Sequence, residues 1–303
     1  MRETVPAALA GERVDRAVAL LTGLPRSEVA GLVESGGVRL SGTTVSTRSR
    51  RVAEGDVLEV DVPEAVVAVA AADASVHVPV VYADDDVIVV DKPAGLVVHP
   101  GSGNRAGTLV NGLLARYPDL AGVGVDPERP GIVHRLDKGT SGLLVVARST
   151  RAYESLVGQL QARTVARVYL GLVAGLVESP AGLVDAPIGR GEGDPTRMAV
   201  SSRGREARTR YVVQARFTEP VAATLVECRL ETGRTHQIRV HMAAIGHPVI
   251  GDARYGGVRA GLTVPRPFLH AHELSFDHPG TGERVSWSSP LPADLDEVRA
   301  RLS

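Results

Sequence analysis

The chain has 303 residues, of which 44% are hydrophobic and 23% are charged, enough for one large core or for two domains. Its net charge of −1 argues against a protein that binds nucleic acid through a general positive excess. A single cysteine, Cys228, excludes an internal disulfide framework and a cysteine-rich metal site. Because Cys228 lies in an alternating, strand-like stretch, we predict that it packs in the core.

The first residues lack the apolar segment of a signal peptide, and no apolar run approaches the length of a membrane span. We therefore expect a cytoplasmic protein with no membrane contact. Only two of the 34 basic residues are lysines, Lys92 and Lys138, so arginine supplies nearly all the positive charge. Guanidinium groups suit phosphate binding, but a compositional bias of the genome would explain the same excess.

Residues 1–62 are predicted to form a small first unit. Apolar residues at helical spacing indicate a helix that starts near residue 14, and Pro25 opens a second one. Residues 36–45 are typical of a tight hairpin, and a further strand is expected after the turn at Gly55. The Ala- and Val-rich residues 63–78 are expected to form a linker that ends in the first strand of the next domain.

From residue 79 to the end, short strands alternate with Gly and Pro turns and with few helices. A helix is expected over 152–160, and strands are expected over 80–82, 87–90, 165–173, 211–217 and 225–230. Neighbouring strands with little helix between them favour an α+β fold. We expect a mixed, mainly antiparallel central sheet with flanking helices and loops.

The segment His-Arg-Leu-Asp-Lys-Gly-Thr-Ser-Gly at residues 134–142 is the most informative part of the chain. It lies between two apolar runs, 131–133 and 143–147, which we predict to be buried strands. A charge at such a place needs a partner or a function, which makes Asp137 a candidate for chemistry. On the local pattern alone, Asp137 could equally be a turn residue and His134 a structural histidine.

Two further segments carry polar residues in an apolar setting. In the strand expected over 165–173, Tyr169 shares a face with Arg167 because side chains alternate along a strand. The segment 231–241 is dense in hydrogen-bonding and cationic groups and leads into a predicted short helix that ends at Gly246. A single carboxylate, a single tyrosine and several arginines suit one nucleophile or base with electrostatic positioning.

Several other chemistries are not supported by the sequence. His236, His241 and His247 are five and six residues apart, whereas a helical pair of metal ligands needs three or four, so we expect no metal site. Phosphate-binding loops, dinucleotide fingerprints and a serine nucleophile elbow are missing from the sequence. The glycine-rich residues 189–193 are expected to form a loop. We predict no cofactor.

Four motifs occur in the order of a known family. They are the segment 92–100, the segment 134–137, the strand with Tyr169 and the segment 232–241. From residue 79 to the end, the chain therefore resembles a pseudouridine synthase of the large class that modifies ribosomal RNA and some transfer RNA.

The first 50 residues or so resemble the alpha-L RNA-binding domain, through the residues 13–15, 26–27 and 38–42. Together the two resemblances imply an alpha-L domain over 1–62, a linker over 63–78 and a catalytic domain of the pseudouridine synthase fold over 79–303.

The resemblance implies a role for four residues. Asp137 would be the catalytic aspartate, which either attacks the target uridine or takes a proton from its ribose. Tyr169 would pack against the flipped base, and Arg239 would pair with Asp137 and keep it ionised. Arg135 would fill the gap that the extruded nucleotide leaves in the RNA.

Further arginines are expected to contact RNA phosphates. In the first unit these are Arg26 and Arg39, with Arg48, Arg50 and Arg51 beside them. In the second unit, a loop over 190–210 that we expect to close on RNA carries Arg197, Arg203, Arg205 and Arg208. The chain departs from the family at Gly139, where an acidic residue is common, and at Arg167, where lysine is common.

The leading hypothesis is an isomerase that converts uridine to pseudouridine in large-subunit ribosomal RNA, with transfer RNA as the alternative substrate. A non-catalytic RNA-binding or ribosome-assembly factor on the same fold is the second hypothesis. A hydrolase that uses Asp137 as nucleophile is the third, although the sequence offers no metal or positioned water. Nothing in the sequence demands more than a monomer.

Overall fold

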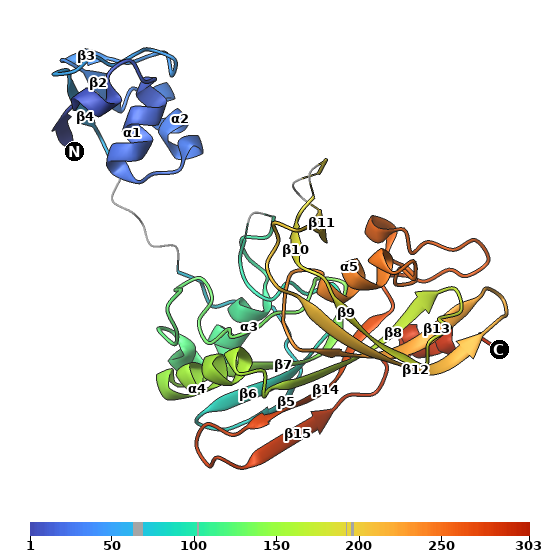
Figure 1. Ribbon diagram of the computed structural model, residues 1–303. Helices are drawn as coiled ribbons and strands as arrows, with labels where there is room; N and C mark the ends of the chain where they lie inside the picture. The colour runs from blue at the N-terminus through green and yellow to red at the C-terminus, as the bar shows by residue number, and fades with distance from the viewer. Residues whose placement is uncertain (63–68, 102, 192, 195–196) are drawn as a thin grey trace. The chain divides into compact units, whose positions relative to one another are not determined.

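The computed structural model describes residues 1–62, 69–101, 103–191, 193–194 and 197–303. The chain divides into two compact units, Met1–Val67 and Ala68–Ser303 (Figure 1). The division falls within the segment that we expected to be a linker. Residues 69–78 nevertheless belong to the second unit structurally, because Ala70 and Val78 are buried in its core.

The first unit packs two helices on a four-stranded antiparallel sheet in the order β1-β4-β2-β3. Both predicted helices form, and Pro25 immediately precedes the second. The N-terminal strand was not expected from the sequence. The elements are β1 (Arg2–Thr4), η1 (Ala7–Leu9), α1 (Val14–Thr22), α2 (Arg26–Glu34), β2 (Val38–Leu40), β3 (Thr43–Thr44) and β4 (Val57–Val60).

The second unit is built on a nine-stranded sheet in the order β5-β6-β7-β14-β8-β13-β12-β9, with β15 paired to β14. Its neighbouring strands are antiparallel except for β7 and β14, which run parallel. The prediction of a mixed, mainly antiparallel α+β fold is confirmed. The strands are β5 (Val80–Ala83), β6 (Val87–Lys92), β7 (Ser141–Ala147), β8 (Ala166–Ala174), β9 (Ala181–Asp185), β12 (Arg208–Phe217), β13 (Ala223–Leu230), β14 (Leu269–Asp277) and β15 (Arg284–Ser288).

Helices cover the sheet and complete the core. The helix α4 lies against the sheet (Figure 1). Its residues Ala152 and Leu156 share one buried cluster with Val145 of β7 and Phe276 of β14. Ser149 caps α4 by accepting a hydrogen bond from the backbone N–H of Ala152. The helical elements are α3 (Leu109–Arg116), η2 (Pro118–Leu120), α4 (Thr150–Gln161), α5 (Gln237–Ala244), η3 (Ala253–Tyr255) and α6 (Ala293–Arg299).

The close approach of β7 to β14 positions the segment that carries Asp137. Every residue of β7 is buried, which explains its continuous apolar sequence. Gly142, at the start of β7, has a φ of 112°, and a Cβ atom there would collide with the backbone of Ala271. Only glycine fits this position, so the segment before β7 is anchored where the parallel strands meet.

Three local predictions were wrong. Residues 131–133 form no strand; Ile132 makes only an isolated bridge with Val146. The helix α5 starts at Gln237 and not at residue 242, because the side chain of Gln237 accepts the N–H of Arg234 and closes the preceding turn. The described part of 190–210 is a hairpin of β10 (Ile188–Arg190) and β11 (Met198–Val200), followed by β12 from Arg208. The loop expected over 189–193 begins within this hairpin, and residues 192, 195 and 196 lie outside the described residues.

In the described part of the chain, no helix is both long enough and apolar enough to cross a membrane.

Candidate active site

A cavity of about 760 Å³ opens in the second unit between the segment 132–140, the strand β8 and the segment 230–239. Its lining includes Asp137, Tyr169 and Arg239, three of the residues singled out from the sequence. They come from different elements: Asp137 from the segment before β7, Tyr169 from β8 and Arg239 from α5. Because β14 separates β7 from β8 by one strand, the sheet order itself brings these segments together.

Asp137 is held by an arginine that is itself fixed by a second carboxylate. Nη1 of Arg239 lies 3.1 Å from Oδ2 of Asp137. On its other side the same guanidinium makes two hydrogen bonds to Asp252, at 2.6 and 3.0 Å. Asp252 is only 1% exposed. The arginine therefore cannot swing away from Asp137 without breaking a buried bidentate pair.

The guanidinium of Arg239 stays charged although it is buried. Burial alone would lower the pKa of the Arg239 guanidinium, but its hydrogen bonds with Asp252 and the charge of Asp137 raise that pKa above its usual value. The arginine is thus a permanent cation beside Asp137. The contact with Asp137 is therefore a charge-assisted hydrogen bond, which holds the carboxylate in one direction.

The ring of Tyr255 also contacts the guanidinium of Arg239. The guanidinium carbon of Arg239 lies 5.0 Å from the centre of the Tyr255 ring, within cation–π distance. Arg197, beside the hairpin β10–β11, lies 4.9 Å from the centre of the same ring. The Tyr255 hydroxyl is 2.9 Å from Nδ1 of His236, whose Nε2 lies 4.0 Å from Asp137. Burial lowers the pKa of His236, and the charge of Asp137 partly offsets this effect.

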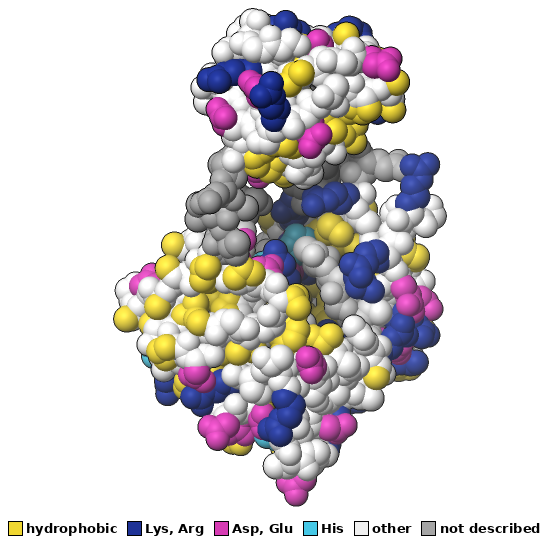
Figure 2. Space-filling view, turned by 90° about the vertical axis from the view of Figure 1, so that its left-hand side faces the viewer, with side chains coloured by type: hydrophobic (Ala, Val, Ile, Leu, Met, Phe, Trp, Pro, Cys, Tyr) yellow, Lys and Arg dark blue, Asp and Glu magenta, His cyan; other side chains and the backbone are white. Residues whose placement is uncertain are grey.

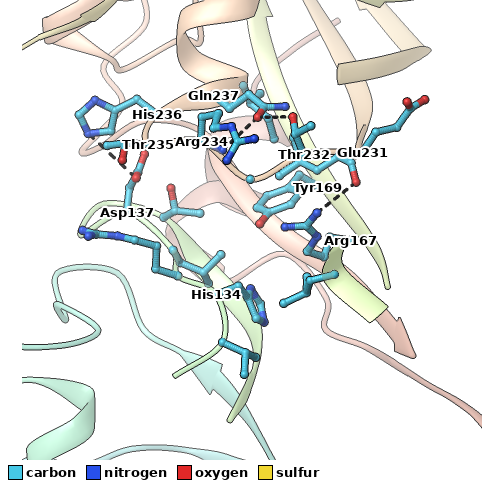
Figure 3. Close-up of a pocket in the computed structure, with 18 of the residues that line it drawn as sticks. His134, Asp137, Arg167, Tyr169, Glu231, Thr232, Arg234, Thr235, His236 and Gln237 are labelled. Atoms are coloured by element: carbon cyan, nitrogen blue, oxygen red, sulfur yellow. Dashed lines mark hydrogen bonds and ion pairs between the residues drawn. The ribbon is translucent and has the colours of Figure 1, made fainter. Parts of the chain in front are cut away.

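The turn before α5 is fixed by Gln237. Its carboxamide oxygen accepts the Thr232 hydroxyl at 2.7 Å and the backbone N–H of Arg234 at 3.0 Å. Its amide nitrogen donates to the backbone carbonyl of Arg208 at 2.9 Å. Figure 3 shows this network on the wall of the cavity above Tyr169. Polar residues of the segment 231–241 thus fix the start of α5, and with it the position of Arg239, the third residue of this helix.

Tyr169 offers an aromatic surface inside the cavity. It is 5% exposed, and burial raises the pKa of its hydroxyl to about 12, so it stays neutral at physiological pH. In the view of Figure 3, Tyr169 lies between Asp137 and Arg167. The strand prediction placed Tyr169 and Arg167 on one face of β8, and both residues line the cavity.

Two members of the segment 134–137 flank Asp137 in different ways. Arg135 is exposed at the cavity, and its Nη1 lies 3.2 Å from Nε2 of His99. His134 points inward, and its Nε2 accepts the backbone N–H of Val145 at 3.2 Å. Burial lowers the pKa of His134 to about 3, so the ring is neutral and helps to hold the segment against β7.

Lys92 is a buried residue close enough to Asp137 to feel its charge, and the sequence did not reveal its burial. Its side chain is fully buried, and Nζ donates hydrogen bonds to the carbonyls of Pro93 and Leu96, both at 2.9 Å. Burial lowers the pKa of Lys92 to about 7, against an opposing effect of the Asp137 charge. In the sequence, the one indication of its burial was that Lys92 comes shortly after the apolar run 87–90.

Asp252 and Tyr255 were missed entirely. Asp252 is 13 residues from Arg239 and 115 from Asp137 along the chain, and no spacing rule links them. A polar residue after a glycine is ordinary turn chemistry. Their importance becomes visible only when the fold places both against the guanidinium of Arg239.

The arginines expected to bind RNA are found in two settings. Arg26 and Arg39 are exposed on the first unit, as are Arg48, Arg50 and Arg51. In the second unit Arg197, Arg203 and Arg205 are exposed, and basic side chains border a hollow on the face shown in Figure 2. Arg208 does not lie in a loop: it belongs to β12 and is paired with Asp185 and Glu231 at 3.1 Å each.

The three histidines weighed as metal ligands bind different groups of the protein. Besides the contact of His236 with Tyr255, His241 contacts Thr209 and the carbonyl of Ala186, and His247 contacts the carbonyl of Ala174. Across the described residues, no group of three or more His, Cys, Asp or Glu side chains is arranged to hold a metal ion. Cys228 lies in the core, as predicted.

Comparison with known proteins decides the family. The family model described as RNA pseudouridylate synthase matches residues 86–244, which include Asp137, Tyr169 and Arg239. The chain belongs to this family. It is 46% identical over 293 residues to an uncharacterized RNA pseudouridine synthase of Bacillus subtilis, covering 96% of this chain and 94% of that protein. The prediction of an RNA-modifying isomerase is thereby confirmed.

Two further relatives extend the comparison. A protein of Nitrosomonas europaea named ribosomal large subunit pseudouridine synthase D is 46% identical over 300 residues, covering 96% of this chain and 85% of that protein. The solved structure of human RNA pseudouridylate synthase domain containing 1 is 30% identical, with a TM-score of 0.58, and covers 76% of this chain and 90% of that one. The resemblance thus extends to the fold.

Proposed function

We propose that this enzyme forms pseudouridine in large-subunit ribosomal RNA, with Asp137 as its catalytic carboxylate. The observation that carries the proposal is the chain of contacts from Asp137 to Arg239 to Asp252 in the wall of the cavity. It supplies one ionised acid with a fixed direction. The substrate class rests on the relative in Nitrosomonas europaea, whose name states the large ribosomal subunit.

The reaction needs one carboxylate and conserves all atoms. The N1–C1′ bond of uridine breaks and its electron pair leaves with the uracil. The base turns, C5 bonds to C1′, C5 loses its proton and N1 gains one. Asp137 would either attack C1′ or remove a ribose proton, and both routes require its ionised form. Because nothing is oxidised or reduced overall, the proposal includes no redox cofactor.

The neighbouring residues would expose and hold the base. Extrusion of a nucleotide costs a few kcal/mol of stacking. Tyr169 would pack against the flipped uracil inside the cavity. Arg135, exposed beside Asp137, would occupy the space that the base leaves, because a planar guanidinium can stack between neighbouring bases.

The first unit would add RNA affinity. We propose that residues 1–62 form an alpha-L RNA-binding domain in which Arg26 and Arg39 face phosphates. Residues 63–78 would link this domain to the catalytic domain at 79–303. Arg197, Arg203 and Arg205 would contact RNA near the cavity. We further propose that the enzyme acts as a monomer, in the cytoplasm where ribosomal RNA is found.

Mapping of pseudouridine in RNA from cells with and without the gene tests this function. We expect one or a few positions of large-subunit RNA to lose the modification and to regain it when the native gene is restored. The gene for Asp137→Asn should not restore it, because the variant keeps the shape and lacks the charge. Sites lost only in transfer RNA would overturn the substrate, and restoration by Asp137→Asn would overturn the role of Asp137.

A further inference from the structure

The cavity contains a buried arginine to which the reaction as described gives no role. Arg167 is 6% exposed, and burial lowers the pKa of its guanidinium. Within the described part of the chain, its Nε has no hydrogen-bond partner, and Nη2 has only the Leu230 carbonyl at 3.5 Å. No carboxylate of the described residues forms an ion pair with it. A buried cation without a counter-charge is costly, so its retention calls for a ligand.

Arg239, which lines the same cavity, differs from Arg167 in having acidic partners. It is similarly buried, at 8% exposure, yet it contacts the carboxylates of both Asp137 and Asp252. Arg266, close to the segment of Asp137, is paired with Asp294 at 2.7 Å. Arg167 is thus a guanidinium that lines the cavity and forms no ion pair with an acid of the described residues.

A glycine makes room for Arg167. A Cβ atom on Gly233 would lie 2.7 Å from Nη1 of Arg167, which is too close for any real contact. Gly233 does not adopt the left-handed backbone that would itself require glycine. A side chain at Gly233 would press on the end of the Arg167 side chain, which gives an independent way to displace the guanidinium.

His134, which also belongs to the cavity lining, has a second buried nitrogen without a partner, and this nitrogen does not face the cavity. Because Nε2 of His134 accepts the N–H of Val145, the proton of the neutral ring is assigned to Nδ1. That Nδ1 is shielded from solvent and has no hydrogen-bond partner among the described residues. Both His134 and Arg167 line the cavity, and the charge of Arg167 is close enough to lower the pKa of His134 further.

We propose that Arg167 binds the carbonyl oxygens of the flipped uracil and stabilises the negative charge that the base acquires as it leaves. The inference rests on the proposed function, because it needs a uracil against Tyr169. Arg167 and Tyr169 project from the same face of β8, so a base packed on the ring lies beside the guanidinium.

The chemistry of the step matches these donors. When the N1–C1′ bond breaks, its electron pair passes to N1 and is shared with O2 and O4 of the uracil. Hydrogen bonds from a cation strengthen as this charge develops, and they weaken again after C5 has bonded to C1′ and N1 has gained a proton. Such donors stabilise the transition state more than the bound substrate, which raises the rate and not the affinity.

A phosphate is the less suitable ligand. Arg135 and Arg205, which also line the cavity, are exposed and would meet the RNA backbone first. Arg167 lies in the interior, where a phosphate would have to enter without its hydration. Uracil is neutral before reaction and carries two carbonyl acceptors, so its transfer from water into the interior costs less free energy than that of a phosphate.

Single-turnover kinetics of Arg167→Met separate the two ligands. The substrate is a fragment of large-subunit RNA that contains the mapped uridine. We expect the rate constant at saturating enzyme to fall about 100-fold, with the Kd for RNA changed less than about threefold. A higher Kd with a salt dependence reduced by about one phosphate contact, and an unchanged rate constant, would overturn the proposal in favour of phosphate binding.

Sulfur substitution in the RNA identifies the contact. Sulfur accepts hydrogen bonds poorly, so 2-thiouridine or 4-thiouridine at the target should slow the native enzyme. If Arg167 contacts the replaced atom, the same substitution should slow Arg167→Met much less. Equal effects on both proteins at both positions would overturn the assignment, even if Asp137→Asn is inactive and the proposed function holds.

Gly233→Ala is a second test of the inference, which still applies if Arg167→Met fails to fold. It leaves the arginine in the sequence and displaces it, so it should slow the native enzyme strongly and slow Arg167→Met little further. Gly171→Ala is the matched control, because a Cβ there meets its neighbours at an ordinary 3.5 Å. Independent, multiplicative effects of Gly233→Ala and Arg167→Met would contradict the inference.

Discussion

The two sides of the cavity satisfy their charged groups in opposite ways. On the paired side, formed by Asp137, Arg239 and Asp252, each charge has its partner within the protein. On the donor side, at Arg167, the buried Nε lacks a protein partner among the described residues. The paired side is therefore set before RNA arrives, whereas we propose that a ligand completes the donor side at Arg167.

This difference separates two demands on an isomerase. An acid that must react needs a fixed direction, which Arg239 gives to Asp137 through their contact at 3.1 Å. A group that recognises and stabilises a leaving base must stay unsatisfied until the base enters. Such a group lowers the stability of the free protein, a cost often found at functional sites. The predictions below compare the two sides through stability and activity together.

Asp252→Asn should have the largest effect, because it breaks the paired side. The amide would direct an N–H toward the guanidinium of Arg239 and leave a buried cation half paired. We expect the free energy of unfolding to fall by about 3 kcal/mol and the isomerisation rate by at least about tenfold. Urea unfolding and single-turnover assays measure the two effects.

Asp119→Asn is the matched control for Asp252→Asn. Asp119 also binds an arginine through two nitrogens, with Arg148 Nε at 2.6 Å, but half of its side chain is exposed. Its loss should cost less than about 1 kcal/mol and leave the rate unchanged. Equal losses for the two variants would mean that the burial of Asp252 is unimportant.

Lys92 should make stability depend on pH. Burial lowers its pKa from 10.5 to about 7 in the folded protein, whereas the unfolded chain keeps the ordinary value. Between these values the unfolded state binds more protons, so stability rises with pH. From pH 7 to 9, the free energy of unfolding of the native protein should rise by about 2 kcal/mol relative to Lys92→Met. Parallel pH profiles would show that the lysine stays charged.

Arg167→Met should stabilise the protein while it slows the reaction. The substitution keeps the length of the side chain and removes a buried cation without a carboxylate partner. We expect the free energy of unfolding to rise by about 1 kcal/mol. Arg135→Met, at an exposed arginine of the same cavity, should change it by less than about 0.5 kcal/mol. A destabilised Arg167→Met would indicate that the arginine is a structural group.

The exposed arginines should affect binding alone. Charge reversal of both Arg203 and Arg205 should weaken RNA binding by about tenfold at moderate salt and flatten its salt dependence. The rate constant at saturating enzyme should stay the same. Reversal of Arg229, an exposed arginine of β13 outside the cavity lining, serves as the control in the same titration. Unchanged affinity for the double variant would remove these arginines from the RNA surface.

Much of the fold was predictable because it depends on local patterns. The buried strands β6 and β7 follow from runs of Val, Ile and Leu, and β13 follows from an alternating pattern. The helix expected over 152–160 lies within α4. The prediction failed at 131–133, where an apolar run pairs with a neighbour at one residue only. It also failed at α5, because polar residues that face a functional site obscure the helical pattern.

The site was predictable where a motif carried it and not where only the fold assembles it. Asp137 was found because a charge between apolar runs is unusual, and Arg239 followed from the family resemblance. Asp252 contacts Arg239 only because η3 packs beside α5, which no local pattern encodes. Arg167 was noted as a departure from the family, but its missing partner became visible only in the structure.

The most direct test of the account is the reaction of purified Asp137→Asn with the mapped RNA fragment, measured beside its RNA affinity. The account predicts pseudouridine formation slower by about 10⁴-fold or more, as for other reactions that lose their essential group, with the Kd for RNA near the native value. Formation at a rate within tenfold of the native enzyme would contradict the claim that one carboxylate, held by Arg239, carries the chemistry.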